Sequence, residues 1–322
     1  MLKYVAIVLL SFLAACQTNP PTDSNSNVVT GKVVITSSVD SAKIYIDDEF
    51  TSLYTPDSLN LIPGNYTISV QKDNYISSPQ TVIVTAEGAE QLYFDLLQVN
   101  IAKVVLLEDF ANTSCAPCVE SNKIIEELKE TYPERLVSVK FPTNFPGPND
   151  PFYLAGKTYC DFRRSYYNVL FAPTIVLDGT VKPIPTDKAD ITQKVESLLN
   201  TQALFAVNVA GSVVGSSYKI NVELEIPEIT GLNFSEMVLY AVITETNIQF
   251  AAPNGETEFF DVMRTVLPSN DGQSLSNVTQ SGKYSFNFEQ TLDPQWNSSN
   301  INVVAYVQNS GTKEIYQAGS NH

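Results

Sequence analysis

The chain has 322 residues, of which 43% are hydrophobic, and a formal net charge of −16 at pH 7. The length predicts two or three domains, and the acidity excludes nucleic acid as a partner because no basic stripe is present to neutralise phosphates. The single histidine, His322, is terminal, which excludes histidine-based hydrolases and most zinc sites, so we expect neither a metal nor another cofactor.

The first sixteen residues have the pattern of an export signal. Lys3 supplies the positive start, and the apolar run at residues 5–15 is too short to span a bilayer. The run ends in Leu-Ala-Ala-Cys, which resembles the lipobox of bacterial lipoproteins and implies that Cys16 is lipidated and becomes the mature N-terminus. The alternative is ordinary secretion with a coincidental cysteine. Because Gln17 is not an acidic retention signal, we expect a lipid-anchored protein of the cell envelope, at the outer membrane, on its periplasmic or surface face.

Residues 17–30 are dominated by Gln, Thr, Asn, Pro, Ser and Asp, which predicts a disordered tether. Residues 31–98 then contain short runs in which apolar and polar residues alternate, a pattern typical of strands in a small β module. The module resembles the PEGA type of surface domain through Ala42, Tyr45, Asp47, Thr55-Pro56, Pro63-Gly64 and Tyr75. The resemblance implies a spacer or a carbohydrate-proximal module, and we expect a structural stalk rather than a ligand site.

A Cys-x-x-Cys motif lies where a predicted strand gives way to a predicted helix. Residues 104–107 are apolar, residues 119–132 have helical spacing, and Cys115 and Cys118 fall between them. The partial positive charge of a helix N-terminus favours a thiolate, and such motifs have thiol pKa values of about 3.5–7.5. We therefore predict a reversible dithiol in which Cys115 attacks and Cys118 resolves the mixed disulfide. The alternative is a permanent structural disulfide.

This segment resembles the thioredoxin superfamily. Asp109 matches the family's buried acid, and Ala172-Pro173-Thr174 matches its cis-proline before a strand, whereas Ser114 stands where thioredoxin has tryptophan. The resemblance implies that Pro173 is cis, packs against the two cysteines and helps to hold a substrate chain. It also implies that Asp109 takes the proton from Cys118, with a pKa raised by burial.

A buried acid, a third cysteine and a pair of arginines each have two interpretations. Neighbouring strand residues face opposite ways, so we expect only one of Glu108 and Asp109 to be buried and favour Asp109. Cys160 lies in a segment predicted to be helical and is expected to be a buried, apolar-like side chain rather than a third redox thiol. Arg163 and Arg164 are expected on a solvated helix face rather than as a pair that steers acidic substrates.

In residues 203–322 the prevailing pattern becomes the alternation of apolar and polar residues that is typical of strands. Alternating runs such as 220–226 and 284–288 predict an antiparallel sandwich of immunoglobulin type, with residues 254–268 as a loop that contains a short helix. Together with the lipobox, a proline-rich insertion at 142–151 and Val262-Met263-Arg264, this arrangement resembles the twenty-eight-kilodalton outer-membrane protein family over about residues 100–322.

These observations predict an α/β thioredoxin-like domain at residues 100–200, flanked by an all-β module at 31–98 and a β-sandwich at 201–322. The predicted function is that of a lipid-anchored thiol–disulfide oxidoreductase that acts on exported proteins with thiols or disulfides. The alternative is a non-catalytic envelope protein for binding or adhesion, in which the disulfide is structural. The candidate catalytic residues are Cys115, Cys118, Asp109 and Pro173, and the membrane is contacted through lipid on Cys16. The sequence predicts neither the redox direction nor the oligomeric state.

Overall fold

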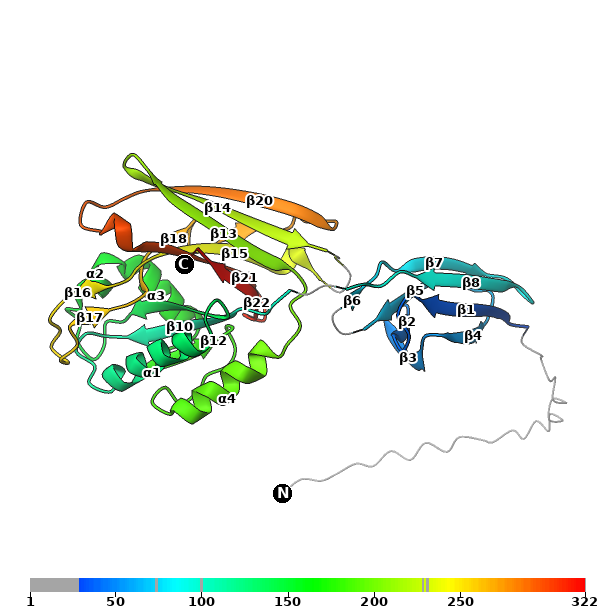
Figure 1. The fold of residues 1–322 in the computed structure, drawn as a ribbon, viewed down its shortest axis with the longest axis horizontal. Helices are drawn as coiled ribbons and strands as arrows, with labels where there is room; N and C mark the ends of the chain where they lie inside the picture. The colour runs from blue at the N-terminus through cyan, green and yellow to red at the C-terminus, as the bar shows by residue number, and fades with distance from the viewer. Residues whose placement is uncertain (1–28, 73–74, 99–100, 228, 230–231, 322) are drawn as a thin grey trace, which may run out of the picture.

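The computed structural model describes residues 29–321 apart from 73–74, 99–100, 228 and 230–231 (Figure 1). The predicted signal, Cys16 and almost all of the predicted tether therefore lie outside the described residues. Among the residues that are described, no helix is long and apolar enough to cross a membrane.

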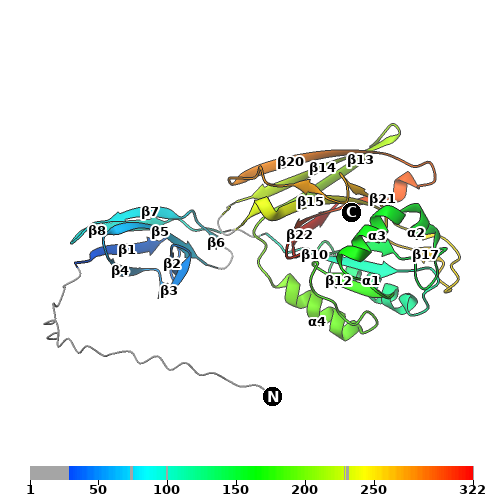
Figure 2. The same ribbon diagram turned by 180° about the vertical axis from the view of Figure 1, so that it is seen from behind.

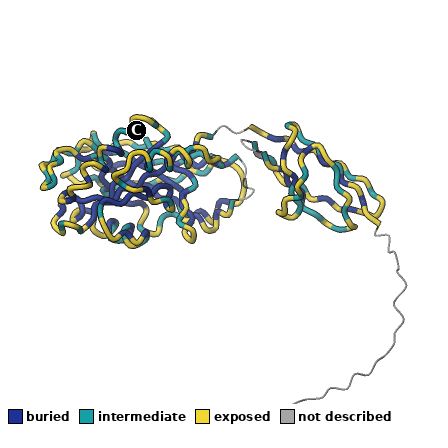
Figure 3. Tube along the Cα trace, turned by 90° about the horizontal axis from the view of Figure 1, so that it is seen from below, coloured by how far each residue is buried: buried dark blue, intermediate teal, exposed yellow. Residues whose placement is uncertain are grey.

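The N-terminal module has two small sheets that face each other across a core of their own, and β6 and β9 form a third sheet of two short strands. One sheet has the strand order β4-β1-β8, in which β1 and β8 are parallel, and the other has the order β3-β2-β5-β7. Alternate residues of these strands, such as Val33, Ile35 and Ile44, are fully buried, as Figure 3 shows for the module as a whole. The strands are β1 (Gly31–Ser37), β2 (Lys43–Ile46), β3 (Glu49–Tyr54), β4 (Asp57–Leu61), β5 (Gly64–Gln71), β6 (Tyr75–Ile76), β7 (Gln80–Val84), β8 (Ala89–Phe94) and β9 (Leu97–Gln98).

The rest of the chain is built on an eight-stranded sheet with the order β12-β10-β11-β18-β15-β21-β22, to which β19 adds beside β15. Its strands come from both halves of this part of the chain. They are β10 (Val105–Ala111), β11 (Leu136–Pro142), β12 (Thr174–Leu177), β15 (Met237–Glu245), β18 (Val262–Leu267), β19 (Gln273–Ser274), β21 (Ile301–Asn309) and β22 (Ile315–Ser320).

The predicted fold class, an α/β thioredoxin-like domain between two separate β modules, is wrong. Strand residues far outnumber helical ones, and β10, β11 and β12 do not form a sheet of their own. Instead β11 pairs with β18 at Lys140 and Val262, and the sheet continues from β18 through β15, β21 and β22. The physical reason is β18, a buried strand in the segment that we expected to be a loop with a short helix, because it joins the two halves into one sheet.

A second sheet, β13-β14-β20, packs its apolar face on β15 and β21. The alternation in β14 places Val222 and Leu224 in this core and leaves the residues between them facing outward. The bounds are β13 (Ala206–Val214), β14 (Ser217–Ile226) and β20 (Gly282–Thr291), with a short hairpin of β16 (Ile248–Gln249) and β17 (Glu258–Phe259) and two 3-10 turns, η1 (Phe234–Glu236) and η2 (Ser298–Asn300).

Helices cover both faces of β10 and β11 (Figures 1 and 2). One face packs on Ile125 and Leu128 of α1 and on Ile191 of α4, and the other packs on Cys160 of α3. All seven residues of β10 and all seven of β11 are consequently buried. The helices are α1 (Cys118–Thr131), α2 (Pro151–Ala155), α3 (Lys157–Tyr166) and α4 (Lys188–Leu199).

Candidate functional site

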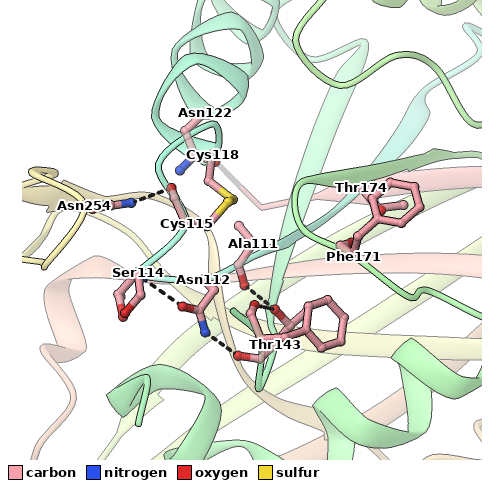
Figure 4. Close-up of a disulfide and its surroundings, with 12 residues drawn as sticks. Ala111, Asn112, Ser114, Cys115, Cys118, Asn122, Thr143, Phe171, Thr174 and Asn254 are labelled. Atoms are coloured by element: carbon pink, nitrogen blue, oxygen red, sulfur yellow. Dashed lines mark hydrogen bonds between the residues drawn. A yellow bond between two sulfur atoms is a disulfide. The ribbon is translucent and has the colours of Figure 1, made fainter. Parts of the chain in front are cut away.

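Cys115 and Cys118 form a disulfide in the turn that leads from β10 into α1 (Figure 4). Their Cα atoms are 5.3 Å apart, and Cys118 is the first residue of the helix. The turn is closed by the backbone, since the Cys115 amide donates to the Asn112 carbonyl oxygen at 2.9 Å and the Cys118 amide to that of Cys115 at 3.2 Å. The predicted pair is therefore present at the predicted strand-to-helix junction.

Both cysteines are buried. Cys115 is 1% exposed and Cys118 is 0% exposed, and they pack with Ala111 and Ala172. Reactive cysteines occupy partly exposed, electropositive positions, whereas buried ones are inert. In this conformation almost none of either cysteine's surface faces solvent.

A loop from a distant part of the chain covers the disulfide turn. This cap loop, residues 250–257, joins β16 to β17 and lies against the turn through Asn254. The Asn254 amide donates to the Thr113 carbonyl oxygen at 3.0 Å, and its side-chain Nδ2 donates to the Cys115 carbonyl oxygen at 3.2 Å (Figure 4). The same Nδ2 donates to Glu256 Oε2 at 2.6 Å, and Asn122 Nδ2 of α1 donates to Glu256 Oε1 at 2.6 Å. The cap loop is thus tied both to the disulfide turn and to the helix that follows it.

The inserted loop at residues 142–151 encloses the turn from another side. Asn112 Nδ2 donates to the carbonyl oxygens of Thr143 at 2.6 Å and Gly147 at 2.8 Å. The Thr113 amide donates to Asp150 Oδ2 at 2.7 Å, while Asp150 Oδ1 caps the start of α2. A Cβ atom at Gly147 would lie 2.6 Å from the Ser114 hydroxyl oxygen, so only glycine fits there without a shift.

Asp109 is buried beneath this turn, on β10, with 1% of its surface exposed. Its Oδ2 accepts a hydrogen bond from the Lys140 ammonium, which also donates to Asn122 Oδ1 at 2.6 Å, while its Oδ1 has no protein partner among the described residues. Burial raises the pKa of Asp109 above its usual value, and the attraction of Lys140 offsets only part of that effect. A continuous set of polar contacts therefore runs from Asp109 through Lys140, Asn122 and Glu256 to the cap loop.

Pro173 stands beside the disulfide. The Ala172–Pro173 peptide bond is cis, as predicted, and Ala172 contacts the two cysteines. Leu170 and Phe171, just before it, are 70% and 65% exposed, and the Thr174 hydroxyl donates to the Phe171 carbonyl oxygen at 2.8 Å. The structure thus places Ala172, the residue that precedes Pro173, against the disulfide.

The expectation that only one of Glu108 and Asp109 is buried is wrong, as is the expectation that Arg163 lies on a solvated face. Glu108 is 0% exposed and Arg163 is 3% exposed, because helices cover both faces of β10. Arg163 donates to both oxygens of Glu108, and Tyr167 donates from its hydroxyl to Glu108 Oε2 at 2.6 Å. Arg163 also donates to Gln308 Oε1 of β21 at 2.8 Å and lies against the rings of Tyr166, Tyr167, Tyr240 and Tyr306.

Cys160 on α3 is 1% exposed, which confirms the expectation of a buried, apolar-like side chain. Burial raises the pKa of its thiol far above the ordinary value, so it stays protonated and unreactive at neutral pH. In the described part of the chain, no group of three or more His, Cys, Asp or Glu side chains is arranged to hold a metal ion.

Sequence reasoning found the cysteines, Asp109 and Pro173 but missed the cap loop, Lys140 and Asn122. The helical spacing of residues 119–132 places Asn122 one turn after Cys118, which was an available signal for a polar group near the disulfide. Asn254 is 139 residues away from Cys115 along the chain, and no local pattern marks it.

The comparisons with known proteins now define the class. The family model described as outer membrane protein Omp28 matches residues 161–321, half of the chain, and the model of the PEGA domain matches residues 30–100. The protein therefore belongs to the Omp28 family and carries an N-terminal PEGA module, which confirms these two predicted resemblances. Membership of this family places it in the cell envelope, at the outer membrane, as predicted. No curated protein resembles the chain closely enough to count as a match.

The first of three similar solved structures supports the fold of the larger part of the chain. HBP35 of Porphyromonas gingivalis is similar with a TM-score of 0.58 at 17% identity, and the alignment covers 69% of this chain and 76% of that one. Protein AGR_C_4864 from Agrobacterium tumefaciens has a TM-score of 0.44 at 14% identity, over 69% of this chain and 95% of that one. A domain of the outer membrane lipoprotein Omp28 from Porphyromonas gingivalis matches with a TM-score of 0.26 at 14% identity, over 37% of this chain and 88% of that one.

Removing the Asn254 side chain is expected to make the disulfide easier to reach. Of the side-chain bonds that Asn254→Ala removes, only the one to the Cys115 carbonyl oxygen ties the cap loop to the turn, since those to Glu256 lie within the loop. One hydrogen bond contributes about 1 kcal/mol net, which corresponds to about fivefold in the opening of the cap loop. We expect dithiothreitol to reduce the disulfide about fivefold faster, measured by timed alkylation and mass spectrometry. Gln249→Ala, which removes an exposed bond to Glu258 in the same hairpin, is the matched control and should leave the rate unchanged.

Proposed function

We propose that this protein is a non-enzymatic lipoprotein of the outer membrane that presents β-rich modules for binding or adhesion, with Cys115–Cys118 as a structural disulfide. The observation that carries the proposal is the burial of both cysteines, which pack with Ala111 and Ala172 in a turn whose backbone is tied to the cap loop. Catalytic dithiols act by attack of an accessible thiolate, which an occluded disulfide does not provide. The lipid anchor on Cys16 belongs to the proposal and supplies the attachment to the membrane.

The disulfide then has a mechanical role. It fixes the turn between β10 and α1, and that turn is the point where the inserted loop and the cap loop both attach. These two loops come from different halves of the larger part of the chain, so the turn holds the halves together beside the shared sheet. An oxidising envelope maintains such a bond without a partner enzyme acting on it repeatedly.

The test uses the full chain in a neutral detergent. We expect no catalysed reduction of insulin disulfides by dithiothreitol above the rate of a Cys115→Ser/Cys118→Ser variant. We also expect a reduction potential below about −300 mV, as is typical of structural disulfides. Turnover that disappears on Cys115→Ser alone would refute the proposal.

A thiol–disulfide oxidoreductase that acts on exported proteins is the second candidate. Its specific support is the contact of Ala172, next to cis Pro173, with the disulfide, together with the buried Asp109. For this candidate, opening of the turn to which the cap loop is bonded would have to precede attack on the buried Cys115. The insulin assay therefore decides between the two, and Asn254→Ala should raise turnover only if this second candidate is correct.

A further inference from the structure

Three aromatic side chains gather on the outer face of the β2–β3 hairpin in the PEGA module. The ring centroids of Tyr45 and Phe50 are 5.3 Å apart, and those of Phe50 and Tyr54 are 5.8 Å apart with their planes at 78°. Phe50 is 42% exposed and Tyr54 is 47% exposed, and none of the three rings belongs to the module's core. The strand that carries two of them, β3, is the last in its sheet. Packing within the module therefore does not account for these rings.

Acidic side chains surround the same rings. Asp47, Asp48 and Glu49 form the hairpin turn just before Phe50, and all three are exposed. The Asp47 carboxylate is fixed in place, since its Oδ1 accepts a hydrogen bond from the Thr67 amide at 2.8 Å. Against these acids the hairpin has one lysine, Lys43, and residues 31–98 together have nine acidic and three basic residues.

Exposed ring faces beside carboxylates attract cations, because the ring quadrupole and the carboxylate charge act in the same direction. The cation–π contacts within the described residues lie on other rings, such as those of Phe260, Tyr153 and Phe145, so no cation from the described part of the chain stacks on these three rings. We call Tyr45, Phe50, Tyr54, Asp47, Asp48 and Glu49 the aromatic–acidic face.

The charges of the possible binding partners leave one kind of partner for the aromatic–acidic face. The chain's own residues 1–28 hold one lysine and one aspartate, so they offer no run of cations. A second copy of the chain has a net charge of −16 and is repelled, as are anionic lipid headgroups and nucleic acid. We propose that the aromatic–acidic face binds an Arg- or Lys-rich segment of a partner protein, whose cations stack on Phe50 and Tyr54 and pair with Glu49 and Asp48. This inference rests on the proposed binding function and names the kind of partner for it.

The experiment measures binding of an octa-arginine peptide to the full chain in a neutral detergent, by calorimetry at about 0.15 M salt, where long-range attraction is largely screened. Loss of two cation–π contacts should weaken binding about tenfold in Phe50→Ala/Tyr54→Ala. Tyr93→Ala removes a ring that is 59% exposed on β8, in the other sheet of the module, and should leave the affinity for the peptide unchanged. Glu49→Gln should weaken binding more than Glu87→Gln, which removes the same charge from an exposed turn elsewhere in the module.

Equal affinity of the wild type and the double variant would overturn the proposal, because the overall acidity alone would then explain binding. Absence of binding overturns it as well. A soluble neutral β-glucan that binds the wild type but not Phe50→Ala/Tyr54→Ala would show that the face takes a glycan instead. If the double variant fails to fold, the affinities of Glu49→Gln and Glu87→Gln for the peptide still test the proposal, and equal affinities would overturn it. None of these variants touches the cysteines, so failure here is distinct from failure of the proposed function.

Discussion

Replacing Arg163 with leucine is expected to lower the free energy of unfolding by about 3–5 kcal/mol, because it leaves the Glu108 carboxylate buried without its cation. Glu108 is 0% exposed, so water cannot take over the lost contacts. The change also removes the donor to Gln308 of β21, which links α3 to the far side of the shared sheet. Urea denaturation followed by tryptophan fluorescence and circular dichroism measures the effect.

Two further variants separate the charge effect from packing. Arg164→Ala removes the neighbouring arginine, whose side chain is 28% exposed and whose Nε lies 3.9 Å from Asp161 Oδ1, a long and weak ion pair. This change should lower the free energy of unfolding by less than about 0.5 kcal/mol. Adding Glu108→Leu to Arg163→Leu removes the unpaired charge and should recover much of the lost stability, since a buried ion pair replaced by apolar side chains is often nearly neutral. If the double variant is as unstable as the single one, the loss reflects packing around the tyrosine rings instead.

How far the sequence predicts this structure depends on the range over which each interaction acts. The disulfide turn was predictable because its signal, the spacing of the two cysteines, is local, and the cis form of Pro173 followed from a resemblance carried by the three adjacent residues Ala172-Pro173-Thr174. The shared sheet was not predictable, because a short apolar run such as β18 has no marker for its partner. Its pairing with β11 spans more than a hundred residues and decides the fold class.

The same limit applies to the site. Arg163 was expected in solvent because it is charged and is followed by a second arginine, but Gln308 of β21 and the tyrosine rings bury it. Glu108 and Asp109 alternate on a strand, which normally leaves one of them in solvent. Both are buried because helices cover both faces of the strand, and each carboxylate forms a buried ion pair. Glu108 pairs with Arg163, and Asp109 pairs with Lys140. A charged residue in the middle of an otherwise apolar strand was the available sign that a buried partner exists elsewhere.

Replacing Lys140 with methionine is expected to destabilise the protein in a pH-dependent way. The Asp109 pKa is already raised by burial in the folded protein, and removal of the Lys140 cation raises it further. A carboxyl whose pKa is higher in the folded state contributes stability that is full below its unfolded pKa of about 3.9 and is lost as the pH rises through the folded value. We therefore expect Lys140→Met to cost about 3–5 kcal/mol at pH 8, where Asp109 must be charged or take up a proton, and much less near pH 4.5.

The measurement is a series of urea unfolding curves between pH 4.5 and 8. Lys123→Met, on α1 with a side chain that is 68% exposed, is the control for loss of a positive charge and should show no such slope. Adding Asp109→Asn to Lys140→Met should abolish the pH-dependent part, because the amide does not titrate. An equal cost of Lys140→Met at both ends of the range would contradict this account. The loss would then come from the Asn122 contact, which connects Lys140 to the cap loop and does not depend on the charge of Asp109.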